Sequence, residues 1–449
     1  MQINEKIFRE YDIRGIYGTD LTPEFAYLFG KAFGSFIQEK GERQVIIGYD
    51  NRSSSPILYE NVRNGILETG ADVVGLGLVT TPMYYFAKKE HSYMCGIMIT
   101  ASHNPKEYNG FKISFDLIGN AYGEAIQEFK NYLLKGDFKK GVGNYYTLDC
   151  KEDYINLMCY ATHLGFRKIK VVVDCGNGTA SIIIKDILDR LKINYFPLYC
   201  ESDPNFPNHH PDPSVPENLK DLSSKVRELG CHLGIAFDGD ADRIGLVDEN
   251  GRVISADLIM DIFYRDLKDK MRPRKAIFDV KCSNTLIWDL KKMGYDTLMY
   301  RTGNSYMNAK IIEDNYMFGG EYSGHIWFND RFPAFDDGIY AGLRLIEILT
   351  NTDKSVSMLL DNLETFISTK EIKIPVKEEE KKALVEKVKN YCIQKDYKIN
   401  TIDGVRVEFL DGFALVRASN TGPDLTVRFE ARSEERMLAL KEEFEALLK

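Results

Sequence analysis

The sequence lacks several features that would place the protein in a membrane or outside the cell. No apolar run approaches the roughly 18 residues that a membrane-spanning helix needs, so no span is expected. The first residues, MQINEKIFREYDIRG, contain no apolar segment of the kind found in signal peptides. The eight cysteines are scattered without CxxC spacing, which favours reduced thiols in a cytoplasmic protein.

The chain also lacks an excess of positive charge. Its 58 Lys and Arg residues are outnumbered by 67 Asp and Glu residues, which leaves a formal net charge of −9. Since no basic tract stands out either, nucleic acid is not expected as a partner. An anionic substrate fits this charge only if its positive contacts are local. At 449 residues the chain is long enough for three or four domains.

A pattern of strand, helix, strand and polar loop recurs three times. The first strands of the three copies are the β-branched runs QVIIGYD, IKVVVDC and KAIFDVK, each ending in polar or turn-forming residues. Each copy later has a second apolar segment, CGIMI, LGIAF or YMFGG, which ends in an unusual polar cluster. Open parallel sheets bind ligands beyond the carboxyl ends of their strands. The sequence therefore predicts three related α/β domains, each presenting one loop there.

The last part of the chain differs from these copies. A charged, helix-prone segment over 376–390 precedes strand-and-turn patterns over 404–431, and a helix-prone segment closes the chain. These features predict a smaller α+β fourth domain. The predicted domains are 1–148, 149–252, 253–365 and 366–449.

The segment DGDADR directly follows an apolar strand and carries carboxylates at alternate positions. In an extended loop Asp238, Asp240 and Asp242 lie on one side, close enough to share one cation, and their hard oxygen atoms suit Mg²⁺ or Ca²⁺. An EF-hand loop would need glycine where Arg243 stands, and helices where the flanking residues indicate strands. The segment therefore predicts a divalent-cation site, with a surface acidic loop as the alternative.

Two further loops carry groups that suit a sugar phosphate. GEYSGH, residues 320–325, combines two glycines with a carboxylate, a hydroxyl and an imidazole that can bind sugar hydroxyls. RASNTGP, residues 417–423, offers a guanidinium, two hydroxyls and an amide around a glycine, a set that suits a phosphate dianion. Each loop taken alone could be an ordinary polar turn. Weaker candidates are Tyr11 and Arg14 in FREYDIRG, and Lys281 at a strand end.

The segment TASHNP sets Ser102 beside His103 after an apolar strand. A hydrolase of the Ser-His-Asp type needs its histidine to reach the serine hydroxyl, and neighbours in sequence rarely achieve that geometry. The G-x-S-x-G turn of many hydrolases is also absent. The metal, sugar and phosphate loops elsewhere favour phosphoryl transfer, which depends on positioning and charge neutralisation. We therefore expect Ser102 to carry a phosphoryl group facing the cation of DGDADR.

These motifs, in this order, resemble those of the α-D-phosphohexomutase family of phosphomannomutases and phosphoglucomutases. They are FREYDIRG, TASHNPKEYNGFK, FPNHHPDP, DGDADR, DVKC, GEYSGH and RASNTGP, and the resemblance covers essentially the whole chain. It implies an α/β fold of four domains around a central cleft, three of them alike with mixed sheets and a smaller C-terminal α+β domain. It also implies a cytoplasmic isomerase that acts on small-molecule sugar phosphates, without nucleic acid, membrane or an obligate protein partner.

The resemblance implies a reaction through a phosphoserine at Ser102. The phosphoryl group would pass to a hexose 1-phosphate of mannose and/or glucose, giving a hexose 1,6-bisphosphate, and Ser102 would then take back the other phosphoryl group. Mg²⁺ would be held by Asp238, Asp240, Asp242 and Ser102. A phosphoglucosamine mutase is the main alternative, and a phosphatase with Asp238 as nucleophile is a more distant one.

The resemblance also assigns roles to the remaining candidates. Arg243 would lie near the reacting phosphate. The candidates for proton transfer or for screening the transferring group are Arg14, His103, Lys112 and His325, among which the sequence does not choose. The sugar hydroxyls would contact Glu321 and Ser323, and the phosphate that is not reacting would contact Tyr11, Lys281, Arg417, Ser419, Asn420 and Thr421. Asn304 stands where bispecific relatives often have histidine, and asparagine cannot move a proton near pH 7.

Overall fold

A computed structural model describes residues 3–117, 119–419, 422 and 424–448. These residues form two compact units, each described by itself. The first comprises the chain up to residue 256 together with 308–315 and 323–359. The second comprises 257–307, 316–322 and the chain from residue 360 onward. No helix among the described residues is long and apolar enough to cross a membrane.

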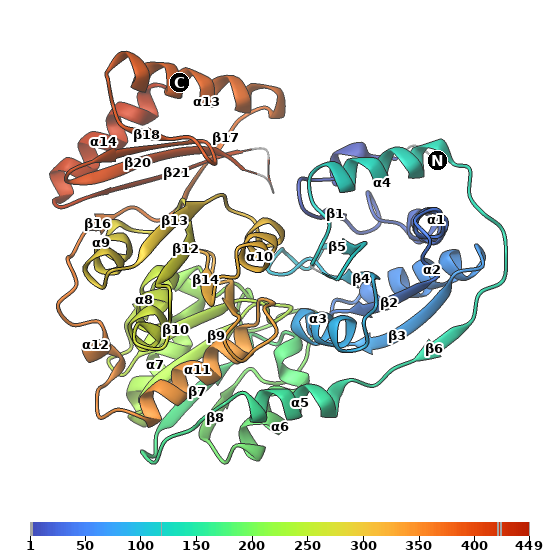
Figure 1. The fold of residues 1–449 in the computed structure, drawn as a ribbon, viewed down its shortest axis with the longest axis horizontal. Coiled ribbons are helices and arrows are strands. Elements are labelled where there is room, and N and C mark those ends of the chain that lie inside the picture. The colour runs from blue at the N-terminus through green and yellow to red at the C-terminus, as the bar shows by residue number, and fades with distance from the viewer. Residues whose placement is uncertain (1–2, 118, 420–421, 423, 449) are drawn as a thin grey trace. The chain divides into compact units, whose positions relative to one another are not determined.

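The first sheet of the first unit has six strands (Figure 1). Strand β2 is parallel to its neighbours β3 and β4, and β5 returns antiparallel to β4. In sheet order the strands are β1 (Ile13–Ile16), β5 (Tyr108–Ser114), β4 (Cys95–Ile99), β2 (Gln44–Tyr49), β3 (Asp72–Leu78) and β6 (Tyr145–Thr147). The accompanying helices are α1 (Pro23–Glu39), α2 (Ser55–Leu67), α3 (Thr81–Glu90) and α4 (Glu124–Lys135), with a short 3-10 helix at Glu5–Ile7.

The second sheet repeats this plan with five strands. Strand β7 is parallel to its neighbours β8 and β9, and β10 returns antiparallel to β9. In sheet order the strands are β11 (Val253–Ile254), β10 (Ile244–Asp248), β9 (Leu233–Phe237), β7 (Lys170–Asp174) and β8 (Asn194–Leu198). Its helices are α5 (Lys151–Tyr160), α6 (Ile184–Arg190) and α7 (Lys220–Leu229), with 3-10 helices at Thr179–Ile182 and Pro216–Leu219. The first unit also contains β15 (Ile326–Phe328), α11 (Gly338–Thr350) and α12 (Val356–Leu359).

A third copy of the plan lies in the second unit, where β12 is parallel to both β13 and β14. Its strands are β12 (Lys275–Asp279), β13 (Asp296–Tyr300) and β14 (Phe318–Gly320). Its helices are α8 (Ala256–Leu267) and α9 (Asn284–Lys292), and α10 (Asn304–Glu313) follows β13. The predicted threefold repeat is therefore confirmed at the level of strand order and direction: the first strand of each copy is central, and the third ends in the predicted polar loop. The domain boundaries stay predictions.

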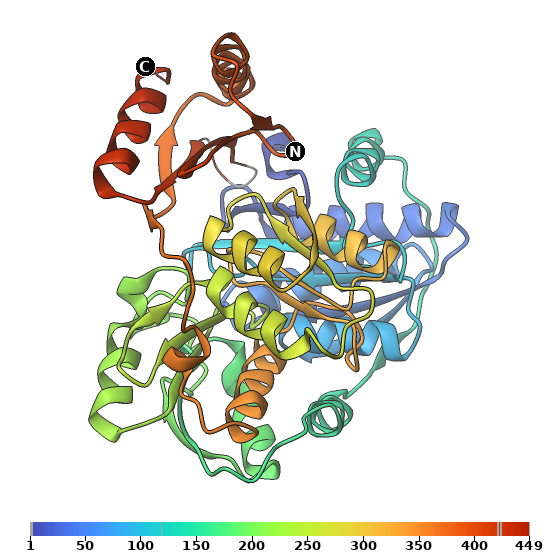
Figure 2. The ribbon, with the colours of Figure 1, turned by 60° about the vertical axis from the view of Figure 1, so that its left-hand side comes forward.

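The C-terminal part is α+β, as predicted. Two helices, α13 (Lys381–Gln394) and α14 (Glu434–Ala446), cover one face of an antiparallel sheet and share an apolar core with it (Figure 2). Helix α13 begins later than the expected residue 376, because residues 378–380 form a separate 3-10 turn. The strands are β16 (Ile367–Ser368), β17 (Ile372–Pro375), β18 (Ile399–Asn400), β19 (Val405–Phe409), β20 (Gly412–Ala418) and β21 (Asp424–Ala431).

Helices α1 and α2 cross closely beside the first sheet because glycines lie at the contact. Helix α1 starts after Thr22, whose hydroxyl accepts a hydrogen bond from the Phe25 N–H at 3.1 Å. A Cβ atom at Gly65 of α2 would lie 2.2 Å from the carbonyl oxygen of Tyr27 in α1, far inside van der Waals contact. Only a residue without a side chain allows this separation of the two helices.

We predict that Gly65→Ala destabilises the first unit. Forcing a methyl group into a packed contact costs about 1–3 kcal/mol, and each kcal/mol lowers the melting temperature of a unit of this size by about 2–4 °C. Calorimetry checks this, with Asn64→Ala on the exposed side of the same helix as the matched control. Equal melting temperatures for the two variants would contradict the close crossing.

Candidate active site

Ser102 lies in the first unit, on the loop TASHNP (residues 100–105) that follows β4 and is called the serine loop below. Strand β4 ends at Ile99, and Ser102 follows in the next turn with its side chain buried and a left-handed φ of 49°. Its hydroxyl donates to Asp238 Oδ2 at 2.8 Å and lies 3.1 Å from His103 Nδ1. Asp238 directly follows β9, the equivalent third strand of the second copy. The polar loops of two repeats therefore meet at this serine.

The three aspartates of the loop DGDADR, residues 238–243 and called the acidic loop below, are fully buried and their side chains converge. Asp238, Asp240 and Asp242 each offer an oxygen, and these atoms lie within 4.8 Å of one another. Asp240 Oδ1 and Asp242 Oδ1 have no hydrogen-bond partner among the described residues. Burial, followed by the charges of Asp242 and Asp240, raises the pKa of Asp238 well above its ordinary value. A hard divalent cation would bind the oxygens that lack a hydrogen-bond partner and would lower the raised pKa of Asp238, so the donor set fits Mg²⁺ or a similar ion.

Lys112, at the middle of β5, supplies positive charge to the same cluster. Its ammonium group lies 2.9 Å from Asp240 Oδ2 and 2.5 Å from Asp242 Oδ2. Thr81, the first residue of α3, donates its hydroxyl to Asp240 Oδ2 at 2.6 Å. Burial alone would lower the pKa of Lys112, but Asp240 and Asp242 outweigh it and raise the pKa well above its ordinary value. Lys112 therefore stays charged, which favours charge screening over proton transfer as its role.

Arg243 and His325 lie beside the three aspartates and contact one another. The Arg243 backbone N–H donates to Asp238 Oδ1 at 3.1 Å, and its Nε–H donates to His325 Nε2 at 2.9 Å. Since Nε2 accepts, the histidine proton is assigned to Nδ1, which lies 2.7 Å from Asp336 Oδ2 and 3.5 Å from Asp242 Oδ1. Asp336 is not among the residues predicted from the sequence, because nothing in its local segment FDDG, residues 335–338, links it to His325.

Of the two N-terminal candidates, Arg14 contacts the serine loop. Arg14 is buried, pairs with Asp12 at 2.6 Å, and donates to the Asn104 side-chain oxygen at 2.9 Å. Partial burial, followed by the positive charges of Arg243 and Arg14, lowers the pKa of His103 well below its ordinary value. His103 is therefore neutral near pH 7 and able to accept a proton. Tyr11 is half-buried three residues before Arg14.

Asp279, which no sequence motif singles out, links two loops of the second unit that carry predicted residues, the loop of Asn304 and the loop of Glu321. Asp279 ends β12, and its carboxylate accepts from the Tyr322 N–H at 2.9 Å and the Thr302 hydroxyl at 2.9 Å. Glu321 is buried after β14 and accepts from the Gly303 N–H at 2.6 Å. These bonds join the loop RTGN, residues 301–304, to the loop GEYSGH. Asn304 begins α10, and Ser323 is half-buried at the start of the stretch that belongs to the first unit.

Two buried cations of the second unit are also held by carboxylates. Lys281 donates to Glu371 Oε2 at 3.2 Å. Arg417 donates through Nε to Asp403 Oδ2 at 2.9 Å, and the same oxygen accepts from the Thr302 N–H at 3.0 Å.

Ser419 lies in the turn after β20, which Lys381 stabilises. The Lys381 ammonium donates to the Ser419 carbonyl oxygen at 2.9 Å, and the Ser419 hydroxyl accepts from the Gly422 N–H at 3.2 Å. Asn420 and Thr421 lie outside the described residues.

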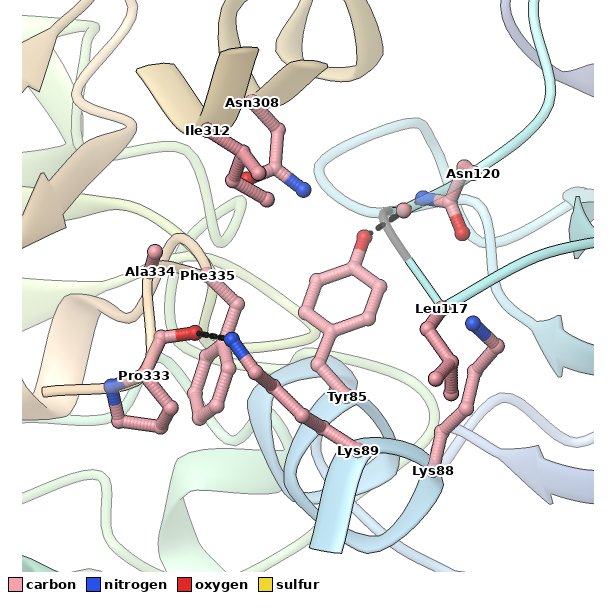
Figure 3. Close-up of a pocket in the computed structure, with 11 residues that line it drawn as sticks. Tyr85, Lys88, Lys89, Leu117, Asn120, Asn308, Ile312, Pro333, Ala334 and Phe335 are labelled. Atoms are coloured by element: carbon pink, nitrogen blue, oxygen red, sulfur yellow. Dashed lines mark hydrogen bonds between the residues drawn. The ribbon is translucent and has the colours of Figure 1, made fainter. Parts of the chain in front are cut away.

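A small pocket of the first unit lies between α3 and the chain around Asn120 (Figure 3). Figure 3 shows Tyr85 reaching Asn120, whose amide donates to the phenol oxygen at 2.7 Å, and Lys89 donating to the Pro333 carbonyl oxygen at 2.6 Å. The cavity measures about 20 Å³. That volume holds a water molecule rather than a sugar phosphate, so this pocket is not the substrate site.

We predict that the three aspartates bind a divalent cation in solution. Asp240→Asn removes one charge without changing size, so it should weaken Mn²⁺ binding roughly tenfold or more. Electron paramagnetic resonance of free Mn²⁺ measures this without any assay of activity. Asp186→Asn, at an exposed position on α6 of the same unit, is the matched control. Unchanged affinity in Asp240→Asn would rule out a site on this loop.

Four family models together match nearly the whole chain. Models of the phosphoglucomutase/phosphomannomutase family match in order: alpha/beta/alpha domain I at residues 5–139, domain II at 151–251, domain III at 255–366, and the C-terminal domain at 371–447.

Full-length relatives agree with these matches. A phosphomannomutase/phosphoglucomutase of Pseudomonas putida is 40% identical over 446 residues, which is 99% of this chain and 96% of that protein. A phosphoglucomutase of Neisseria gonorrhoeae is 40% identical over 451 residues, covering 99% of this chain and 97% of its own length. The crystal structure of a phosphoglucomutase/phosphomannomutase family protein from Burkholderia thailandensis superimposes with a TM-score of 0.91 at 36% identity, over 100% of this chain and 98% of that one. The chain therefore belongs to the phosphoglucomutase/phosphomannomutase family.

Proposed function

We propose that this protein is a phosphohexomutase that interconverts hexose 1-phosphates and hexose 6-phosphates of mannose and/or glucose. The observation that carries the proposal is the 2.8 Å hydrogen bond from the Ser102 hydroxyl to Asp238 inside a buried three-aspartate cluster. A serine in that position can carry a phosphoryl group beside a divalent cation. Relatives named phosphomannomutase/phosphoglucomutase support the substrate class.

In the proposed reaction, Ser102 carries a phosphoryl group in the resting enzyme. The bond between Ser102 Oγ and phosphorus breaks, a bond from phosphorus to the sugar 6-oxygen forms, and the proton of the 6-hydroxyl passes in net terms to Ser102 Oγ. The bond between the sugar 1-oxygen and phosphorus of the resulting hexose 1,6-bisphosphate then breaks as that phosphorus bonds Ser102 Oγ, and the serine proton passes in net terms to the sugar 1-oxygen. Asp238, Asp240, Asp242 and Ser102 would hold Mg²⁺, which when bound neutralises negative charge on the transferring group.

The side chains around Ser102 support a division of labour in this reaction. Lys112 and Arg243 would screen the transferring phosphoryl group, since both stay charged beside the aspartates. His103 would move the proton, because it is neutral and its Nδ1 lies 3.1 Å from the Ser102 hydroxyl; His325 would be the alternative where its Nε2 is released from Arg243. Arg14 would hold the serine loop through Asn104 and face the phosphate.

The residues of the sugar and phosphate loops would bind the rest of the substrate. Glu321 and Ser323 would take sugar hydroxyls, and Asn304 would offer a hydrogen bond without proton transfer. The phosphate that is not reacting would be held by Tyr11, Lys281, Arg417, Ser419, Asn420 and Thr421. Support comes from the carboxylate contacts that orient Lys281 and Arg417.

The experiment is a turnover assay with Mg²⁺ and a trace of glucose 1,6-bisphosphate. Mannose 1-phosphate, glucose 1-phosphate and glucosamine 1-phosphate are offered separately, and hexose 6-phosphate is followed. Ser102→Ala should lower kcat by a factor on the order of 10³ or more, because the phosphoryl carrier is lost. Ser224→Ala, at an exposed position on α7, should leave the rate unchanged.

The outcomes separate the candidate functions. Turnover of the mannose or glucose substrate, lost in Ser102→Ala, supports the proposal and fixes the sugar preference. Turnover of the glucosamine substrate alone would make the protein a phosphoglucosamine mutase. Release of inorganic phosphate that survives Ser102→Ala and disappears in Asp238→Asn would replace the mutase with an Asp-nucleophile phosphatase.

A further inference from the structure

Arg52 is a buried cation that neither the motifs nor the proposed reaction accounts for. It lies in the polar segment after β2, and only 1% of its surface is exposed. Its guanidinium group donates to backbone carbonyl oxygens, and all of them belong to the serine loop and the residues just after it. The acceptors are Ser102 at 2.8 Å, Asn104 at 2.7 Å, Pro105 at 2.7 Å and Tyr108 at 3.1 Å.

Asp50 orients this guanidinium. Its carboxylate accepts from Arg52 Nε at 3.1 Å and from the Arg52 backbone N–H at 3.0 Å. The same carboxylate accepts from the Ser55 hydroxyl at 2.6 Å, at the start of α2. The Asp50 N–H donates to the Ile99 carbonyl oxygen at 2.9 Å, where β4 ends and the serine loop begins. The ion pair is therefore anchored to the end of β4, from which the serine loop continues.

The backbone of Ser102 needs such an anchor. Its φ of 49° lies in the left-handed region, which residues other than glycine seldom adopt. This conformation directs the carbonyl oxygen to Arg52 and the hydroxyl to Asp238. On its other side the carbonyl oxygen meets Gly239 of the acidic loop, where a Cβ atom would come within 2.5 Å of it. One carbonyl group thus sits between the buried arginine and the predicted cation loop.

We propose that Arg52 is a positioning residue for phosphoryl transfer, which holds Ser102 in the left-handed conformation that directs its hydroxyl at the aspartate cluster. The inference rests on the proposed function. Arg52 acts through backbone carbonyl groups and touches neither substrate nor cation. Its planar fork reaches four acceptors at once, and the single ammonium of lysine cannot span them.

The test compares Arg52→Lys with Arg344→Lys. Arg344 is a matched control because it is also 1% exposed, belongs to the same unit, and pairs with Asp330 at 2.7 Å. Both variants should melt earlier, since each loses a buried guanidinium. Only Arg52→Lys should lose kcat, by roughly 10²-fold, with KM nearly unchanged, because a displaced reacting group slows transfer without weakening sugar binding.

Amide hydrogen exchange over residues 101–108 supplies a readout that does not depend on activity. Exchange there should rise in Arg52→Lys and stay at the wild-type level in Arg344→Lys. If Arg52→Lys does not fold, Asp50→Asn keeps the arginine and should show the same changes at smaller size.

The outcomes distinguish the two proposals. Equal kcat and equal exchange in the two lysine variants would overturn the positioning role, as would a loss in Arg52→Lys that falls on KM alone. A wild-type protein without turnover of any hexose phosphate would overturn the proposed function. In that case the exchange data would still decide whether Arg52 orders the serine loop.

Discussion

Three carboxylates buried within one short loop require positive charge and hydrogen-bond donors around them, and this requirement accounts for the side chains that surround Ser102 in the first unit. Asp238, Asp240 and Asp242 are fully buried, so their negative charges repel one another strongly because water does not screen them. Lys112 and Arg243 offset part of this charge, and a divalent cation would offset more. The Ser102 hydroxyl donates a hydrogen bond to Asp238, one of these three carboxylates. A phosphoryl group on that serine would meet positive charge already in place.

The repeated α/β plan makes such a cluster available. In each copy the third strand runs parallel to the central one and ends in a polar loop, so the loops emerge at carboxyl strand ends. The first copy supplies Ser102 and the second supplies the aspartates. The third copy, in the second unit, ends in the loop of Glu321, whose carboxylate accepts from the Gly303 N–H, and Asp279 bonds both to this loop and to Thr302. The three copies therefore share one arrangement of strands and helices but differ in the functional groups of the loop that follows the third strand.

The sequence predicts the strands well, because the apolar pattern that forms each strand is local. Runs such as VVVD are short, β-branched and followed by turn formers, which favours buried strands, and DGDADR carries its three carboxylates within five positions. Partners that act across the fold were missed, because a single arginine or aspartate has no periodicity or spacing that names its contact. These partners are Asp50, Arg52, Asp279, Asp336, Lys381 and Asp403. The late start of α13 was missed for a local reason, since its acidic lead-in forms a 3-10 turn first.

The proposed role of Ser102 as a phosphoryl carrier to and from a sugar can be measured in a single turnover. Protein carrying ³²P on Ser102 is mixed with an excess of unlabelled glucose 1-phosphate or mannose 1-phosphate. If Ser102 has this role, the label leaves the protein within one turnover and appears in hexose bisphosphate and hexose 6-phosphate. Label that remains on Ser102, or that appears only as inorganic phosphate, would contradict it.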